Sequence, residues 1–396
     1  MKRKTLIIII ILVLEAALLA GAVAAFFWLE RGRESAETTV PTTTAEPTTI
    51  PPTTVPPTTV PPTTVPPTTE AETVPPETTE PEPEYFTLTF VGDCTLGSDP
   101  NSMGSGSFVK VIGEDYGYPF RNVADYFHND DATFVNLEGV FADEGDGEDK
   151  LFRFRGPLTY GNILTEGSVE AVTLANNHIM DFGEEGFRST KGVLDGRRIH
   201  YAQQDGSVIF NTKSGLRIGM YAVSFQMDKE DMAAEVAKMR ENGAEIVILA
   251  LHAGTEGSYR ATKKQIDYAH AAIDAGVDIV WGHHSHRLQP IEEYNGGIIY
   301  YGLANFSFGG NRAPRDMDTV LVQQQIVREP DGTVHRGELT LIPCSMSSSK
   351  NVNNYQPTPY EPDSKAWNRA LSKLDGTYTG PDQIPSYARS PETTAP

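Results

Sequence analysis

A proline-rich repeat divides this 396-residue chain and limits where a folded core can form. Between residues 34 and 84 the unit PPTTV recurs almost unchanged, so that a pair of prolines returns about every five residues. Proline fixes its own φ angle and lacks a backbone N–H, and such a segment therefore cannot enter a helix interior or a central strand. We expect residues 34–84 to form an extended, disordered linker, whose threonines suggest an O-glycosylated stalk.

The residues before this linker have the composition of a membrane-spanning segment. Residues 1–33 begin with the basic sequence MKRK and continue with an apolar run that is longer than the ~20 residues a helix needs to cross a bilayer. Basic residues stay on the cytoplasmic side, so the rest of the chain should lie outside the cell. We expect a single-pass membrane anchor with an extracellular C-terminal domain. The alternative is a signal peptide cleaved near residues 22–24, which would give a secreted protein.

The overall charge argues against one class of partner. The chain has 53 acidic against 32 basic residues and a formal net charge of −21, and its only basic cluster is the head of the apolar segment. Binding to a nucleic-acid backbone requires clustered lysine and arginine that neutralise phosphates. We therefore expect no nucleic-acid partner.

After the linker, short apolar runs alternate with segments of helical character, which is typical of an α/β domain. We expect this domain to cover residues 85–360. A C-terminal extension, residues 361–396, should follow it and be disordered from about Leu371, where its composition resembles the linker. Helices are expected at 183–199 and 261–276. Strands are expected at 85–93, 132–139, 169–178, 216–225, 245–254, 277–284, 297–306 and 319–327.

Polar side chains follow directly after the apolar residues of six of these strands. In open α/β sheets, ligands bind outside the carboxyl ends of the strands, so we expect these side chains to meet in one place. Any one of them alone could be a helix cap, a turn residue or a structural histidine. The residues concerned are Asp93, Asn136, Glu138, Asn177, His178, His252, His284, His286 and Asn305.

The chemistry of this set favours a divalent transition metal. Imidazole nitrogens, carboxylates and an amide oxygen together suit Zn²⁺, Mn²⁺ or iron, whereas Ca²⁺ prefers oxygen ligands. We therefore predict a divalent metal centre at the carboxyl ends of the strands.

Six motifs, in order along residues 85–345, support a more specific interpretation. They are FVGDCTLG, VNLEG, LANNHIMDFGEEGF, LHAGTEG, WGHHSHRLQPIEEY and YGLANFSFG. Together they resemble the CapA/PgsA family, which is associated with poly-γ-glutamate capsule biosynthesis and in turn resembles the calcineurin-like metallophosphoesterases. The resemblance implies a four-layer αββα sandwich built around two facing sheets, with an anionic cell-envelope polymer and membrane-bound synthase or export subunits as partners.

The resemblance also implies which residues bind metal. A first ion would be held by Glu138, Asn177, His252 and His284. A second ion would be held by Asp93, Glu138 and His286. This second set is weaker because Thr95 stands where the metallophosphoesterase pattern has a histidine. We therefore expect one ion, with room for a second if the weaker set binds it.

Two further residues of the motifs receive different roles from the resemblance. His178 would contact the substrate or protonate a leaving group, and Asp181 could either orient His178 or cap the following helix. His283 falls outside the family pattern and is expected to point away from the site, so that its loss should matter least.

Other residues are candidates for handling the substrate. Glu256 could be an acid/base or a hydrogen-bond partner of the site, or an ordinary loop carboxylate. Arg153 and Arg155 alternate with phenylalanine in FRFRG and could grip a carboxylate or phosphate, although a plain surface strand is the alternative. Asn305 is expected to bind substrate.

The chain has two cysteines, Cys94 and Cys344. Export permits a disulfide and the even count is compatible with one. We expect that the two could form a disulfide, which would fix the C-terminal segment beside Asp93.

Three functions fit these observations. The first is an exported metal-dependent hydrolase or transferase that acts on a polymer such as poly-γ-glutamate, with His178 as acid. The second is a non-enzymatic accessory subunit that binds or guides the polymer in a synthesis and export complex. The third is a metal-stabilised adhesion or scaffold domain on a stalk. Retention of His178 favours chemistry, and the missing histidine at position 95 favours the accessory role.

Overall fold

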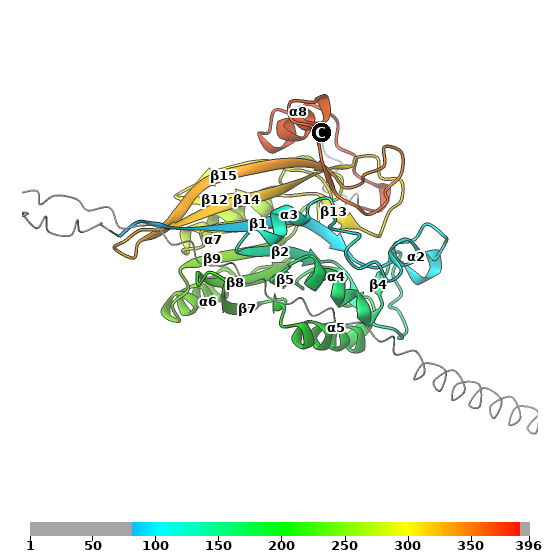
Figure 1. Ribbon diagram of the computed structural model, residues 1–396, viewed down its shortest axis with the longest axis horizontal. Coiled ribbons are helices and arrows are strands. Elements are labelled where there is room, and N and C mark those ends of the chain that lie inside the picture. The colour runs from blue at the N-terminus through cyan, green and yellow to red at the C-terminus, as the bar shows by residue number, and fades with distance from the viewer. Residues whose placement is uncertain (1–80, 389–396) are drawn as a thin grey trace, which may run out of the picture. The chain divides into compact units, whose positions relative to one another are not determined.

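Two β-sheets lie face to face in the part of the chain that the computed structural model describes, residues 81–388 (Figure 1). The predicted membrane anchor at 1–33, nearly all of the linker at 34–84 and the last residues of the C-terminal extension lie outside the described residues. Among residues 81–388, no helix has the length and apolar character needed to cross a membrane.

The first sheet has a parallel half and an antiparallel half. Strands β1, β2, β5 and β6 are parallel, and β13 runs parallel to the end of β1; β14, β15 and β16 continue the sheet in antiparallel fashion. The spatial order is β16 (Thr358–Pro359), β15 (Val334–Ser345), β14 (Asp318–Arg328), β1 (Glu84–Thr95), β2 (Ala132–Leu137), β5 (Ala171–Thr173) and β6 (His200–Ala202), with β13 (Asn305–Phe308) beside β1.

The second sheet has four parallel central strands and antiparallel edges. Its order is β11 (Ile291–Tyr294), β12 (Gly297–Tyr300), β10 (Ile279–His283), β9 (Ile246–His252), β8 (Arg217–Ser224) and β7 (Gly206–Asn211). A separate two-stranded ladder pairs β3 (Val140–Phe141) with β4 (Arg155–Gly156).

Helices cover the outer faces of both sheets. Those against the first sheet are α2 (Phe108–Ile112), α3 (Ala124–His128), α4 (Gly161–Glu166) and α5 (Gly183–Arg197). Those against the second sheet are α6 (Lys229–Glu241) and α7 (Lys263–Asp274). Helix α8 (Lys365–Leu374) lies beside β14 and β15 (Figure 1), and three short 3-10 turns, η1 (Pro100–Ser102), η2 (Leu158–Tyr160) and η3 (Ser386–Ala388), complete the elements.

Side-chain alternation along the central strands produces these layers. In β9, Ile246, Ile248 and Ala250 enter the core between the two sheets, whereas Val247 and Leu249 enter the core beneath α6 and α7. Successive side chains of a strand point to opposite faces, so a strand that is apolar at every position is buried on both sides. The layer order is thus helix, sheet, sheet, helix, and the predicted α/β fold is confirmed.

One predicted strand is divided between the two sheets. Residues 297–306 were expected to form a single strand, but β12 ends at Tyr300 in the second sheet and β13 begins at Asn305 in the first. The intervening chain crosses from one sheet to the other, and Ala304 adopts a left-handed φ of 63° on the way. The whole stretch is apolar, so its composition gives no sign of this crossing. The crossing places Asn305 beside Asp93, its pairing partner in β1.

The expected disulfide between Cys94 and Cys344 is not formed. Both cysteines are free and buried, and burial raises the pKa of each thiol well above its usual range. Strand β14 lies between β1, which carries Cys94, and β15, which carries Cys344. Neighbouring strands are ~4.8 Å apart, so residues two strands apart exceed the ~6.8 Å Cα separation that a disulfide tolerates.

The C-terminal segment is ordered further than its composition suggests. Helix α8 begins at the N-cap Ser364, and Ala370 and Leu374 pack into the core between the sheets. Lys373 is only 2% exposed, and its ammonium group donates hydrogen bonds to Asp316 at 2.6 Å and to Asp318 at 2.7 Å. The expectation of disorder from about Leu371 is therefore wrong as far as residue 388, because apolar residues at helical spacing anchor a segment that is otherwise polar.

The buried ammonium group of Lys373 predicts a large stability effect. Replacing Lys373 by alanine leaves the buried Asp318 carboxylate with Arg369 as its remaining cationic partner. We expect Lys373→Ala to lower the free energy of unfolding by about 3 kcal/mol in urea denaturation. The control is Lys365→Ala on the exposed face of the same helix, which should change it by less than about 0.5 kcal/mol. Equal effects of the two substitutions would show that α8 does not dock as described.

Candidate metal centre

A β-bulge in β1 directs Asp93 into the space between the sheets. Phe90 pairs with Phe134 and Asp93 pairs with Asn136, so β1 uses three residues where β2 uses two. The extra residue shifts the alternation, since without it Asp93 would face the helices rather than the second sheet. Gly92 is required within the bulge, because a Cβ atom there would lie 2.0 Å from the carbonyl oxygen of Ala304.

Two histidines reach the same space from paired strands of the second sheet. His252 ends β9 and His283 ends β10, and the two residues are register partners. Ile279 and Trp281 of β10 belong to the core between the sheets, and alternation therefore directs His283 there as well. Nδ1 of His283 lies 2.8 Å from Oδ1 of Asp93.

The prediction that His283 points away from the site is consequently wrong. His283 is 2% exposed and holds the Asp93 carboxylate in place. The spacing of the family motif gave His283 no role, whereas the strand period, which is legible in the sequence, would have placed it correctly.

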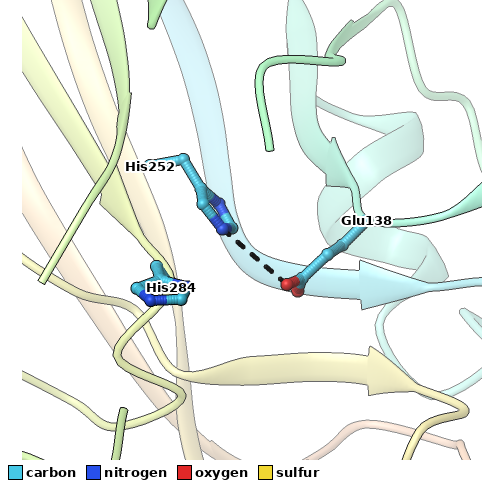
Figure 2. Close-up of side chains that lie close together, drawn as sticks. All are labelled: Glu138, His252 and His284. Atoms are coloured by element: carbon cyan, nitrogen blue, oxygen red, sulfur yellow. Dashed lines mark ion pairs between the residues drawn. The ribbon is translucent and has the colours of Figure 1, made fainter. Parts of the chain in front are cut away.

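Glu138, His252 and His284 form a first group of candidate ligands (Figure 2). The carboxylate of Glu138 and the ring of His252 point toward each other, with Nε2 of His252 lying 3.8 Å from Oε1 of Glu138. The ring of His284 is centred 4.9 Å from that of His252. Asn177 joins the group, because its Oδ1 lies 2.8 Å from Nε2 of His252. The structure thus brings together all four residues assigned to the first ion.

Asp93, Glu138 and His286 form a second group that shares Glu138 with the first. Nδ1 of His286 lies 2.7 Å from Oδ1 of Asn305 and 3.1 Å from Oδ2 of Asp93. Thr95, which stands where the pattern has a histidine, is fully buried, and its hydroxyl group has no partner among the described residues. The second group therefore has three ligand atoms, and the Thr95 hydroxyl group is a poor replacement for the imidazole that would supply a fourth.

Several buried polar atoms at this centre have no hydrogen-bond partner among residues 81–388. They include both carboxylate oxygens of Glu138 and Nδ1 of His284. An unpaired charge in a protein interior is costly, and such groups are normally paired or bound to a metal. A cation shared by these atoms satisfies them, so the residues present fit a divalent metal ion.

The pKa values describe the electrostatics of the centre without an ion. Burial lowers the pKa of His284 to about 3 and that of His252 well below its usual range, so both rings are neutral and can bind a metal. Burial, reinforced by Asp93, raises the pKa of the Glu138 carboxyl group. Burial alone would lower the pKa of His286, but the carboxylates of Glu138 and Asp93 raise it to about 10. Without an ion the centre therefore favours a protonated Glu138 beside an ion pair of Asp93 and His286, and a dication would stabilise the Glu138 carboxylate instead.

Backbone strain is concentrated in the loop that carries the last two candidate ligands. His284 and His286 have left-handed φ angles of 82° and 52°. Such conformations cost about 1–3 kcal/mol each in a non-glycine residue and persist only where the surrounding structure enforces them. They aim the two rings at the two different ligand groups, although only one residue separates them in sequence.

His178 lies beside the ligand groups and is oriented by a carboxylate. Nδ1 of His178 lies 2.7 Å from Oδ2 of Asp181, which also accepts the backbone N–H of Phe154 at 2.8 Å. Lys150 forms an ion pair with the other oxygen of Asp181 and donates to the carbonyl group of Asn177 at 2.6 Å. Asp181 thus orients His178, and the far ring nitrogen, Nε2, remains for a substrate.

A cavity of 570 Å³ opens beside the centre. Four of the predicted residues line it, namely His178, Glu256, His286 and Asn305. Two arginines that the sequence reasoning missed, Arg287 and Arg315, also line the cavity, together with C-terminal residues that include Gln383 and Tyr387. Arg287 directly follows the histidine cluster in the sequence, so its position near the site was predictable. The C-terminal residues reach the cavity only through tertiary contacts.

The two arginines predicted to grip substrate lie elsewhere. Arg153 donates to the carbonyl groups of Gly147 and Glu148, and Arg155 donates to that of Gly145. Neither residue lines the cavity. Both guanidinium groups therefore fix the loop before β4, and the cavity takes its positive charge from Arg287 and Arg315 instead.

Fold and site together define an α/β domain with a buried candidate metal centre at the carboxyl ends of its strands and a polar cavity beside it. Residues 87–310, more than half of the chain, match the bacterial capsule synthesis protein family PGA_cap. The chain belongs to this family, which confirms the resemblance to CapA/PgsA proteins seen in the motifs.

Three relatives illustrate this membership. The capsule biosynthesis protein CapA of Bacillus anthracis is 28% identical over 276 residues, which cover 62% of this chain and 65% of that protein. The PGA biosynthesis protein CapA of Bacillus subtilis is 27% identical over 308 residues, or 71% of this chain and 75% of that protein. A probable polyglutamine synthesis accessory protein of Mycobacterium tuberculosis is 28% identical over 214 residues, or 44% and 55% of the two chains.

The first ligand group predicts the effect of removing His252. Its ring contacts both Glu138 and Asn177, so His252→Ala should abolish high-affinity binding of Mn²⁺ or Zn²⁺, measured by metal content after dialysis and by calorimetric titration. The exposed His335, which pairs with Glu329, provides a matched control, and His335→Ala should bind metal like the wild type. Unchanged metal content in His252→Ala would contradict the ligand assignment.

The contact between His283 and Asp93 predicts a smaller effect on the same measurement. Outer partners of metal ligands typically contribute 10- to 100-fold in metal affinity, and we expect a loss of about this size for His283→Ala. A wild-type affinity would show that His283 is dispensable for holding Asp93.

Proposed function

We propose that this protein is an exported, membrane-tethered enzyme, a metal-dependent hydrolase or transferase that acts on an anionic cell-envelope polymer such as poly-γ-glutamate. The apolar segment at 1–33 would anchor the chain, and the proline-rich linker would hold the domain outside the membrane. On this proposal the domain has the four-layer architecture of the calcineurin-like metallophosphoesterases. Accessibility of the domain to protease added to intact cells tests the location, and full protection would contradict it.

One observation carries the enzymatic proposal: a histidine oriented by a buried carboxylate shares a cavity with His286, one of the candidate metal ligands. His178 and His286 line the same cavity, and Asp181 holds His178 through Nδ1. A domain that only displayed or stored a polymer would have no need of an oriented proton donor beside a metal centre. The arrangement matches the geometric requirements of general acid catalysis.

The residues of the centre have two roles, metal binding and proton donation. A divalent ion held by Glu138, Asn177, His252 and His284 would polarise the scissile group and lower the pKa of water. Hydrolysis requires that the departing nitrogen or oxygen gain a proton, and Nε2 of His178 is placed to supply it. His178 begins this step protonated on both ring nitrogens and ends it as the neutral imidazole, and Lys150 fixes the Asp181 carboxylate that accepts the Nδ1–H.

The cavity itself favours an anionic substrate. Arg287 is held in place by the carbonyl group of His286 at 2.6 Å and by Gln383 at 3.2 Å, and exposed Arg315 also lines the cavity. Guanidinium groups bind carboxylates with charge-assisted hydrogen bonds. The names of the relatives refer to capsule, PGA and polyglutamine synthesis, and they support a polymer with repeated carboxylates as the substrate class.

An accessory role is the second candidate, and Thr95 favours it. Its hydroxyl group replaces an imidazole in the second ligand group, so a second ion would be bound weakly. A two-metal clamp holds both the attacking and the leaving oxygen atoms, and its loss would reduce catalysis. In this role the domain would bind or guide the polymer beside synthase or export subunits without cleaving it.

Turnover assays distinguish the two roles. We expect the purified full-length chain, loaded with Mn²⁺ or Zn²⁺, to shorten poly-γ-glutamate, as measured by size-exclusion chromatography, or to hydrolyse a generic phosphodiester. His178→Ala should lower kcat by about 10²- to 10⁴-fold and leave the metal content unchanged. Bound metal and bound polymer without any turnover would instead establish the accessory role.

A further inference from the structure

A second cavity adjoins the one beside the metal centre. It has a volume of 410 Å³, and Phe152, Phe154, Gly310 and Asn311 line both cavities. The two are therefore neighbouring compartments of one groove, with the phenylalanines between them. Either volume falls in the range of ~300–1,000 Å³ that is typical of ligand sites.

The far wall of the second cavity is a glycine- and serine-rich loop. This loop, residues 98–107, includes Ser107, which is only 7% exposed and whose hydroxyl group has no hydrogen-bond partner among the described residues. Ser107 is the N-cap residue of α2, yet its side chain makes no capping hydrogen bond. A hydroxyl group without a partner can turn toward a ligand in the cavity that its residue lines.

A cationic side chain lies at the same wall. The guanidinium group of Arg312 lies against Gly106, where any Cβ atom would be only 1.1 Å from Nη1 of Arg312. Asp99 is the acidic residue of this lining, but its carboxylate oxygens accept the backbone N–H groups of Asn101 at 2.8 Å and of Arg153 at 3.4 Å. The second cavity thus offers a hydroxyl group and a cation to a ligand, and its carboxylate is already engaged.

We propose that the second cavity is a subsite for the continuation of an extended polyanionic chain whose reacting segment occupies the cavity beside the metal centre. Arg312 binds a carboxylate of that continuation and Ser107 donates a hydrogen bond to it. This inference rests on the proposed function, because it assumes that the first cavity receives the reacting segment. The second cavity would make the protein bind long polymer chains more tightly than short ones.

The aromatic residues between the compartments fit this arrangement. Phe152 is 40% exposed and contacts Tyr387 edge to face, with ring centroids 5.7 Å apart. Tyr387 in turn lies against the Glu256 carboxylate in the first cavity. Phe152 and Phe154 therefore offer an apolar surface between the two cavities. The methylene groups of a polymer chain can pack on this surface while its carboxylates bind in the cavities on either side.

Binding of chains of graded length tests the subsite. Poly-γ-glutamate oligomers from two residues to several tens of residues are titrated into the metal-loaded full-length chain by calorimetry. We expect the wild type to bind long oligomers more tightly than short ones. Arg312→Ala should weaken binding of long oligomers about tenfold and leave short ones unchanged, because one charge-assisted contact is lost. Ser107→Ala should weaken the same binding by a smaller factor, and Arg312→Lys should retain part of it.

Arg188→Ala is the matched control, since Arg188 is exposed on α5 and lines neither cavity. It removes the same charge and should bind all lengths like the wild type. Equal affinity of the wild type for short and long oligomers, or unaltered binding in both Arg312→Ala and Ser107→Ala, overturns the subsite and leaves the proposed function standing. No binding of any oligomer by the wild type overturns both. If Arg312→Ala fails to fold, Ser107→Ala, which removes no hydrogen bond of the described protein, decides the question alone.

Discussion

The buried carboxylate of Glu138 is the constraint on which the rest of this structure depends. It is fully buried between the two sheets, and neither oxygen has a partner within residues 81–388. Burial favours the protonated form of such a group, so that its ionised form requires a positive charge next to it, and Glu138 belongs to both candidate ligand groups. The bulge in β1 and the strained histidine loop bring ligands toward this one carboxylate, and the crossing between β12 and β13 brings Asn305 to His286.

The surrounding network fixes the ligands before any ion binds. His283 holds Asp93, Asn305 holds His286, and Asn136 donates to Asp93 at 2.9 Å. These partners determine which ring nitrogen and which carboxylate oxygen face the centre, so metal binding requires little reorganisation. His178 is fixed in the same way, because its orientation depends on Asp181 and Lys150.

The sequence predicted which candidate ligands lie together but not their surroundings, for identifiable reasons. Asp93, Glu138, Asn177, His252, His284 and His286 were found because each follows an apolar strand, and parallel strands end at one edge of a sheet. The motif spacing gives His283 no role, although the strand period of β10 directs its side chain into the site. Arg153 and Arg155 lie outside the main cavity, because alternation gives the face of a residue but not its partner, and nearby loop carbonyl groups bind both.

By itself the sequence determined the α/β alternation, the family and the set of candidate metal ligands, since these follow from local periodicity, from the ordered motifs and from the chemistry of single side chains. Only the tertiary structure decided which groups share a cavity. The insertion of one residue in β1, the passage of residues 301–304 between the sheets and the docking of residues 382–387 beside the centre depend on contacts between segments far apart in the chain. No local pattern encodes such contacts, because each is stabilised by a partner that the segment meets only after folding.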